Sequence, residues 1–321
     1  MIDSRDIFSV SSPEQFSAVT MEIFRFQAES CPPYREYLRL IGADIEAINT
    51  IEQIPMLPIE LFKSHNIYSA SSEPQIVFTS SATTGMTPSR HPVADLTIYE
   101  RDFIEGFRLF YGEPEKWSIY GLLPSYLQRS GSSLIYMVDR LIALCGRGGF
   151  YLNNYRQLLD DMAADPRPKI LLGVTYALLD LAEQYAPKLE NTVVMETGGM
   201  KGHRAEMSKT ELHKVLCSAF GVDKIHSEYG MAELMSQGYS VGEGLFAAPP
   251  WMKVMVRDLN DPFKVLDIGR RGAINIIDLA NIYSCSFIAT QDMGIVYADG
   301  TFRIEGRVTD ADIRGCNLLV Q

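Results

Sequence analysis

The sequence predicts an α/β fold with mainly parallel sheets packed with helices and a β-rich C-terminal part. From Ile76 onward, short runs rich in β-branched residues alternate with longer amphipathic stretches. Strands that alternate with helices of about 10–15 residues are typical of βαβ units and a parallel sheet. After Gly244 the pattern changes to strands and turns, whereas the first 66 residues show helical spacing. The chain therefore divides into a helical start, an alternating middle and a strand-rich end.

Residues 1–66 are predicted to form an N-terminal helical cap. Ser12 and Pro13, followed by Glu14, are typical of a helix start. The stretch FSAVTMEIFRFQAES then carries apolar residues at helical spacing. Residues 67–321 are predicted to follow as one compact α/β body, because no linker, repeat or low-complexity segment interrupts them.

The predicted strands and helices of the middle region follow one another in pairs. These are IVFT and DLTIYERDFIEGFRLFYG, SIYGLLP and SSLIYMVDRLIALCG, KILLGV and TYALLDLAEQYA, and TVVMETGG and RAEMSKTELHKVLCSAFG. The strand-rich end comprises WMKVMVRDL, GAINIID, SFIATQD and IVYADGTFRI, the last with an Ala-Asp-Gly turn signal.

Composition and charge exclude several classes of function. The net charge is −11, from 40 acidic and 29 basic residues, which argues against a nucleic-acid or anionic-membrane surface. The five cysteines form no CxxC pair, so neither a zinc site nor a disulfide framework is indicated. No apolar stretch reaches the roughly 18 residues that a membrane span needs, and the N-terminus does not resemble a signal peptide. We expect a soluble cytoplasmic protein.

The stretch TSSATTG, directly after the apolar run IVF, has two interpretations. Clusters of Ser, Thr and Gly are usually ordinary surface loops. The alternative is a phosphate-binding loop, because ligands bind beyond the carboxyl ends of strands in an α/β sheet, and hydroxyls and backbone N–H groups suit phosphate oxygens. The residues that would contribute are Ser80, Ser81, Thr83, Thr84, Gly85 and Arg90. No Gly-Lys-Ser/Thr follows, so a Walker A loop is excluded.

Two further stretches carry polar residues of interest. HSEYGMAE (226–233) contains an aromatic residue, a glycine and two carboxylates, and QDMG (291–294) is expected to place Asp292 at the end of a strand. Taken singly, Glu228 and Glu233 are expected to be solvated surface carboxylates.

Together, the order of these motifs resembles the adenylate-forming enzymes, the superfamily of acyl-CoA ligases and firefly luciferase. The motifs are TSSATTG, HSEYGMAE, QDMG and EGRVTDADIRG, and the match runs from about residue 70 to the C-terminus. Within the superfamily, LPSYLQRSGSSLIYMV, TGGMKGHR and the ending at RGCNLLVQ resemble the LuxE-like acyl-protein synthetases, which ligate long-chain fatty acids.

The resemblance implies the N-terminal domain fold of these enzymes and an ATP site with Mg²⁺. Ser81, Thr83, Thr84 and Gly85 would line the β- and γ-phosphates, with Ser80 and Arg90 beside them. Gly198 and Gly199 would approach the adenine, and Tyr229, followed by Gly230, would stack on it. Glu233 would hold Mg²⁺, while Asp292 and Arg307 would contact the ribose. A carboxylic acid would then attack the α-phosphorus to give an acyl-adenylate and pyrophosphate.

Cys316 matches the near-terminal cysteine that accepts the acyl group as a thioester in the LuxE-like branch. The competing interpretation is a small buried hydrophobic residue. The resemblance further implies a fatty or related acid as substrate, and acyl reductase or acyltransferase subunits, or an acyl carrier, as partners.

Two features depart from the family pattern. Ala82 stands where the loop most often has glycine, and only 11 residues follow Asp310, so the small C-terminal lid domain of the family is expected to be missing.

Three other functions are alternatives to acyl-protein synthesis. A phenylacetate-type CoA ligase would share the TGG-MKG pattern, and a non-catalytic acyl-binding scaffold would bind lipid without consuming ATP. GYSVG (238–242) fits the G-x-S-x-G pattern of serine hydrolases, but the last histidine in the chain is His226, ahead of that serine. A serine hydrolase is therefore excluded.

Overall fold

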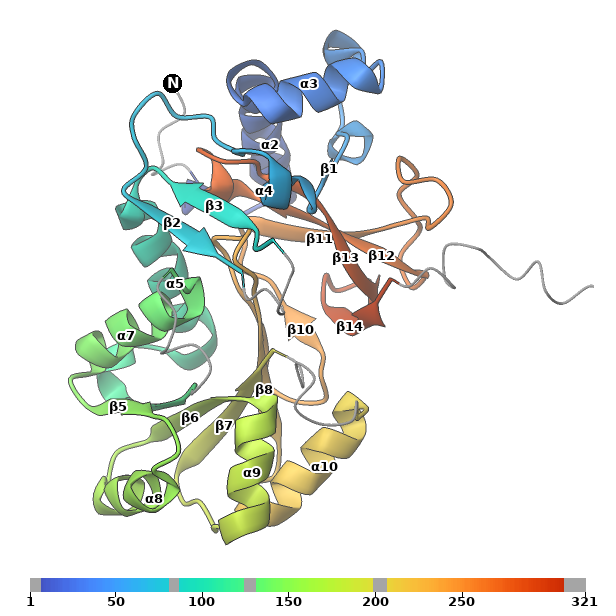
Figure 1. The fold of residues 1–321 in the computed structure, drawn as a ribbon. Helices are drawn as coiled ribbons and strands as arrows, with labels where there is room; N and C mark the ends of the chain where they lie inside the picture. Colours follow the sequence, from blue (N-terminus) through green and yellow to red (C-terminus); the bar gives the residue numbers. More distant parts are fainter. Residues whose placement is uncertain (1–6, 81–86, 124–130, 199–206, 309–321) are drawn as a thin grey trace, which may run out of the picture. The chain divides into compact units, whose positions relative to one another are not determined.

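The computed structural model describes residues 7–80, 87–123, 131–198 and 207–308, which form two compact units (Figure 1). The first unit contains Met1–Ile98, Glu233–Met235 and Ala247–Gln321, and the second contains Tyr99–Ala232 and Ser236–Phe246. The α/β class is confirmed. The predicted division into a cap of residues 1–66 and one larger body stays a prediction.

Helices open the first unit. Helix α2 (Pro13–Ser30) begins as predicted, with Ser12 accepting a hydrogen bond from the Gln15 N–H at 3.2 Å. The buried Gln27 amide donates to the carbonyl oxygens of Asn281 and Ile282, both at 2.9 Å, and thereby fixes α2 to the strand-rich part of this unit. The other short elements are α3 (Pro32–Leu40), η1 (Ile45–Ala47), η2 (Ile51–Gln53), β1 (Leu57–Pro58) and α4 (Leu61–Ser64).

The strand-rich end forms an antiparallel arrangement in which each strand pairs with the next. Its elements are β11 (Met252–Arg257), β12 (Arg271–Asp278), η4 (Leu279–Asn281), β13 (Phe287–Val296) and β14 (Phe302–Arg307), and β1 joins β13 in parallel. The predicted Ala-Asp-Gly turn is confirmed, because the Tyr297 N–H donates to Thr301 at 2.8 Å and Gly300 has a φ of 82°.

The placement of Asp292 at a strand end was wrong. Asp292 lies inside β13, which continues without a break to Val296. Gly294 resembles a turn residue in the sequence, but in the structure a Cβ there would overlap the carbonyl oxygen of Arg303 on β14. The glycine thus permits close approach of two strands beside a shift in their register.

The strand before the hydroxyl-rich stretch also differs from the prediction. Strand β2 (Ile76–Thr79) does not belong to a parallel sheet but pairs antiparallel with β3 (Arg90–Val93), which precedes α5 (Leu96–Tyr111). Pro92 makes the second strand hard to recognise, because proline is rare in strands other than those at edges. Residues 80–89 therefore connect the two strands of a hairpin.

The second unit contains the predicted parallel sheet, with neighbours in the order β8, β7, β6, β4, β5. Strand β9 pairs antiparallel with β8. The strands are β4 (Ser118–Leu122), β5 (Gly148–Tyr151), β6 (Lys169–Val174), β7 (Thr192–Thr197), β8 (Ile225–Tyr229) and β9 (Gly238–Ser240), and β10 is Phe246–Ala247. The helices are η3 (Pro114–Lys116), α7 (Ser133–Cys145), α8 (Tyr155–Ala164), α9 (Thr175–Tyr185) and α10 (Lys209–Phe220). Strand β5 and helix α8 were not predicted.

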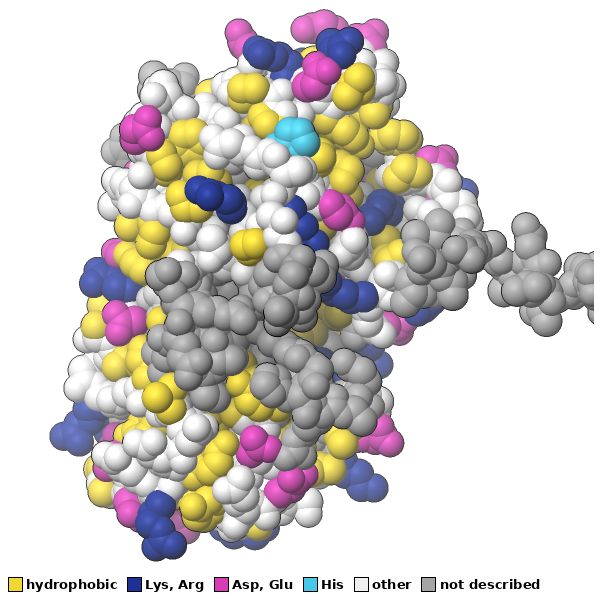
Figure 2. Space-filling model, viewed as in Figure 1, with side chains coloured by type: hydrophobic (Ala, Val, Ile, Leu, Met, Phe, Trp, Pro, Cys, Tyr) yellow, Lys and Arg dark blue, Asp and Glu magenta, His cyan; other side chains and the backbone are white. Residues whose placement is uncertain are grey.

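The face drawn in Figure 2 carries basic and acidic side chains interspersed with one another. Within the described residues, none of the helices combines the length and the apolar character needed to cross a bilayer.

Candidate functional site

The base of the β2–β3 hairpin is closed by two serines in the first unit. The Ser80 N–H donates to the Ser89 carbonyl oxygen at 3.1 Å, and the Ser89 N–H donates to the Ser80 hydroxyl at 2.9 Å. Arg90 is exposed and lies opposite Thr79 on the paired strand. The other predicted loop residues lie outside the described residues; these are Ser81, Thr83, Thr84 and Gly85.

The hairpin base contacts the predicted metal ligand. The Ser89 hydroxyl donates a hydrogen bond to the Glu233 carboxylate, and the Asn281 amide donates to the Glu233 carbonyl oxygen at 2.8 Å. Glu233 is only 7% exposed, so the expectation of a surface carboxylate was wrong. Burial raises the pKa of Glu233, although the Ser89 hydrogen bond opposes that shift. The structure thus joins a buried carboxylate to the segment predicted to bind phosphates.

Asp292 and Arg307 form a cross-strand pair. They lie opposite one another on β13 and β14, with 3.6 Å between the Arg307 Nε and the Asp292 carboxylate. The arginine side chain is mostly exposed, whereas the aspartate side chain is mostly buried. The structure therefore brings together the two residues predicted to contact the ribose.

The residues predicted to bind adenine lie in the second unit, at the carboxyl ends of neighbouring parallel strands. Gly198 follows β7 with a φ of 69°, and its carbonyl oxygen accepts a hydrogen bond from the Thr175 hydroxyl at 2.9 Å. Tyr229 ends β8, and its ring meets the Phe246 ring edge to face with centroids 5.9 Å apart. Gly199 lies outside the described residues.

Glu228 is buried as well, contrary to the expectation of a surface position. The Thr197 hydroxyl donates a hydrogen bond to its carboxylate. Burial raises the pKa of Glu228 to about 7, since the Thr197 hydrogen bond offsets only part of the desolvation. A Cβ at position 230 would overlap the other carboxylate oxygen of Glu228, so only glycine fits there without displacing it.

Glu196 was missed by the sequence analysis. It is 2% exposed, and its carboxylate lies 2.5 Å from the Lys209 ammonium and 3.5 Å from the His213 ring, with the Ser227 hydroxyl also donating to it. Burial alone would raise the pKa of Glu196, but the hydrogen bonds from His213, Lys209 and Ser227 and the lysine charge lower it overall. A charged residue at the end of the apolar run TVVM was the available signal.

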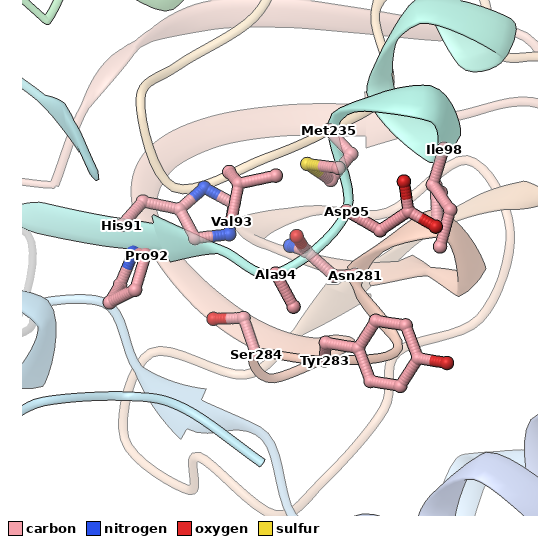
Figure 3. A pocket seen from close by; sticks show the side chains of 11 residues that line it. His91, Pro92, Val93, Ala94, Asp95, Ile98, Met235, Asn281, Tyr283 and Ser284 are labelled. Atoms are coloured by element: carbon pink, nitrogen blue, oxygen red, sulfur yellow. The ribbon is translucent and has the colours of Figure 1, made fainter. Parts of the chain in front are cut away.

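A small pocket lies in the first unit next to the segment that carries Glu233 (Figure 3). Its lining includes His91, Met235, Asn281 and Ser284, and it offers about 10 Å³ of space, roughly that of one water molecule. Within the described residues, the Asn281 Oδ1 atom is buried without a hydrogen-bond partner. The pocket therefore suits a water bound to Asn281 and is too small for an acyl chain.

The sequence indicated neither a zinc site nor a disulfide framework. In the described parts of the chain there is no group of three or more His, Cys, Asp or Glu side chains that could hold a metal ion alone. The described cysteines, Cys31, Cys145, Cys217 and Cys285, are free thiols. Cys316 lies outside the described residues.

Comparison of the fold with solved structures shows which proteins share it. MatB from Rhodopseudomonas palustris with bound ATP matches with a TM-score of 0.56 and 17% identity over 83% of this chain and 51% of MatB. An open form of 2-hydroxyisobutyryl-CoA ligase with 2-HIB-AMP and CoA matches with a TM-score of 0.67 and 14% identity, over 92% of this chain and 70% of the ligase. The thioesterification state of that ligase gives a TM-score of 0.67 over 95% and 71%. The chain has the fold of the adenylate-forming ligases.

This similarity has limits in sequence and in length. No protein-family model matches the chain, and no curated protein matches it by sequence. The chain spans about half the length of MatB. At identities of 14–17% the comparison establishes the fold alone. A function has to be argued from the side chains of the candidate site.

Proposed function

We propose that the chain is an AMP-forming ligase that activates a carboxylic acid with ATP. The observation that carries this proposal is the hydrogen bond from Ser89, at the base of the hydroxyl-rich hairpin connection, to the buried carboxylate of Glu233. It joins the predicted phosphate-binding segment to a predicted metal ligand. The fold shared with MatB in its ATP-bound form, and with a CoA ligase that holds 2-HIB-AMP, supports the same proposal.

The hairpin connection would bind the phosphates. Its ends are fixed by the paired hydrogen bonds between Ser80 and Ser89, so hydroxyl and backbone N–H donors of the connection start from a rigid base. In this proposal the donors come from Ser80, Ser81, Thr83, Thr84 and Gly85, with Arg90 as a nearby cation.

Glu233 fits the role of a Mg²⁺ ligand. Its carboxylate is buried, its pKa is raised by burial, and within the described residues no lysine or arginine lies within ion-pair distance of it. A cation would neutralise this charge, and Mg²⁺ is commonly held by one or two carboxylates together with substrate phosphates. The ion would neutralise phosphate charge during the reaction.

The nucleoside would be bound by the remaining predicted residues. Tyr229 would stack on the adenine, with Gly198, Gly199 and Gly230 allowing the backbone to approach it. Asp292 would accept hydrogen bonds from the ribose hydroxyls, and Arg307 would donate to the same sugar. The observed proximity of Asp292 and Arg307 suits recognition of one sugar by both side chains.

The proposed reaction is a displacement at the α-phosphorus. A carboxylate oxygen of the acid bonds to this phosphorus while the bond to the bridging oxygen breaks, which yields an acyl-adenylate and pyrophosphate. Such a step requires alignment of the reactants and neutralisation of charge more than a protein nucleophile. Glu233 and Arg307 would supply these effects from this chain.

The finer assignment is a LuxE-like acyl-protein synthetase that acts on a fatty or related acid. The Cys316 thiolate would attack the acyl carbonyl of the adenylate, the thioester would form, and AMP would leave. An acyl reductase, acyltransferase or carrier would then accept the acyl group. The competing assignment is a CoA ligase, which is favoured by the presence of CoA in the structures of 2-hydroxyisobutyryl-CoA ligase.

The experiment is intact-mass measurement of the protein after incubation with ATP, Mg²⁺ and a panel of fatty acids, with and without CoA, beside Cys316→Ser. We expect an acyl mass increment that requires ATP and is absent from the variant. Acyl-CoA formation without an increment would assign CoA as the acceptor. Binding of fatty acid without AMP production would contradict ligation and leave a scaffold.

A further inference from the structure

Two buried carboxylates of the second unit lie on neighbouring strands, one residue apart in the register. In the register of β7 and β8, Glu196 lies opposite Ser227 and Thr197 lies opposite Glu228. The Ser227 hydroxyl donates to Glu196, and the Thr197 hydroxyl donates to Glu228. Because successive side chains of a strand point to opposite faces, each face of the sheet carries one carboxylate–hydroxyl pair at this edge.

The Glu196 pair is connected to the predicted adenine-binding segments through two neighbours. The Thr175 hydroxyl lies 3.4 Å from the Glu196 carboxylate and donates to the Gly198 carbonyl oxygen at 2.9 Å. The Lys209 ammonium, 2.5 Å from Glu196, lies 5.0 Å from the centroid of the Phe246 ring. Phe246 in turn packs edge to face against Tyr229.

Glu228, on the other face of the sheet, contacts the residue that follows Tyr229. Its carboxylate oxygen occupies the space that a side chain at Gly230 would need. The backbone that follows Tyr229 therefore packs directly against Glu228, whose position is set by Thr197 on the adjacent strand. Moving or shortening Glu228 would remove the contact that fixes the backbone at Gly230.

From this arrangement we infer that Glu196 and Glu228 are positioning residues that hold Gly198 and Tyr229 in place for an adenine base. This inference rests on the proposed function. Neither carboxylate needs to touch the nucleotide. Glu196 fixes Lys209, and through Phe246 the ring of Tyr229, while Glu228 fixes the backbone at Gly230. A preorganised stacking surface lowers the cost of ordering these groups on binding.

The inference is tested by equilibrium binding of ATP, GTP and inorganic tripolyphosphate, each with Mg²⁺, to the whole chain, together with KM and kcat for pyrophosphate release. Glu228→Ala is expected to weaken ATP binding about tenfold, because the adenine loses its stacking surface. Binding of tripolyphosphate should change little, since this ligand has no base. The ratio of the affinities for ATP and GTP should move closer to one. Glu228→Gln, which keeps the shape and can accept from Thr197, should restore most of the affinity.

Gly230→Ala provides a second arm. Alone it must displace the Glu228 carboxylate and is expected to weaken ATP binding, whereas in the Glu228→Ala background the space is free and the added effect should be small. If Glu228→Ala does not fold, Lys209→Met is measured in its place. The Lys209 side chain is 35% exposed, so this substitution is expected to perturb folding less. Glu190→Gln, an exposed position in the same unit, serves as the control.

The outcomes separate this inference from the proposed function. If the parent protein binds and consumes ATP but Glu228→Ala and Lys209→Met bind ATP and tripolyphosphate as the parent does, the positioning role is overturned and the ligase proposal stands. If the parent protein binds no ATP, both are overturned. A lower melting temperature with unchanged ATP affinity would assign the carboxylates to stability alone and would also overturn the inference.

Discussion

Glu228 and Glu233 belong to one short motif, yet they lie in different units and in different surroundings. Both are buried, both accept a hydrogen bond from a hydroxyl of a distant segment, and burial raises both pKa values. Thr197, the donor to Glu228, belongs to a regular parallel strand. Ser89, the donor to Glu233, belongs to the base of a hydroxyl-rich hairpin connection.

Burial alone therefore does not assign a role to a carboxylate. Glu228 contacts Thr197 of the neighbouring strand and packs against the backbone at Gly230. The neighbours of Glu233 come from the predicted phosphate-binding segment, where a cation would complete its environment.

The largest effect is expected for Glu233→Gln. The amide keeps the shape and can accept from Ser89, but it lacks the charge that a Mg²⁺ ligand supplies. Pyrophosphate release should fall about 1,000-fold, or about 4 kcal/mol of transition-state stabilisation. The measurement is the initial rate with saturating ATP and acid, with the exposed Glu46→Gln as control. A rate within a few-fold of the parent protein would remove Glu233 from the mechanism.

The next effect concerns the pH dependence of stability at Glu228. In the folded protein this carboxyl keeps its proton up to about pH 7, whereas its usual pKa is 4.5. Between these values the folded state holds the extra proton, so the contribution of Glu228 to stability falls as the pH rises and is constant above pH 7. Burial raises this pKa and the charge of Glu196 adds to the shift, whereas the Thr197 hydrogen bond and the Lys209 charge oppose it.

Glu228→Gln removes this titration. Relative to the parent protein, the variant should gain up to about 3 kcal/mol of unfolding free energy as the pH rises from 4.5 to 7, at about 1.4 kcal/mol per pH unit. Urea unfolding at several pH values measures the difference. A difference that stays constant across this window would show that Glu228 ionises normally.

A smaller effect is expected for Tyr229→Ala, which removes the proposed stacking ring without touching either glutamate. The apparent KM for ATP should rise about tenfold, since stacking on an aromatic side chain contributes about 1–3 kcal/mol per base. The KM for the acid should change little. An unchanged KM for ATP would mean that adenine binds elsewhere.

The smallest effect is expected for Ser89→Ala. The hydroxyl lowers the pKa of Glu233, so its loss should raise that pKa further and shift the acidic limb of the pH–rate profile to higher pH. At neutral pH the rate should fall about fivefold, in keeping with the roughly 1 kcal/mol of one hydrogen bond. Thr197→Ala is the matched control, because it removes the hydroxyl that donates to Glu228. An equal shift of the pH–rate profile in this variant would contradict the different roles proposed for Glu228 and Glu233.

The sequence predicted the parts of the fold that depend on local pattern. The alternation of apolar runs with amphipathic stretches was enough for β4, α7, β6, α9 and β7, and helix α2 was recognisable from Ser12 and Pro13. The hairpin was missed because Arg90, His91 and Pro92 do not resemble a strand, and its pairing depends on β2.

The site could be predicted only as far as residue identity allows. Order and type of residues pointed to Glu233, Asp292 and Tyr229, and the structure places Asp292 against Arg307. Burial of Glu228 and Glu233 and the network around Glu196 depend on partners such as Thr197, Ser89 and Lys209, which are remote in sequence. No periodicity in one chain reveals such contacts.

Formation of an acyl-adenylate by this chain can be measured as exchange of labelled pyrophosphate into ATP in the presence of Mg²⁺ and a panel of carboxylic acids. We expect exchange that requires a fatty or related acid and is lost in Glu233→Gln, because only a reversible acyl-adenylate links the pyrophosphate and ATP pools. Absence of exchange with every acid, in a protein that binds ATP, would contradict adenylation by this chain.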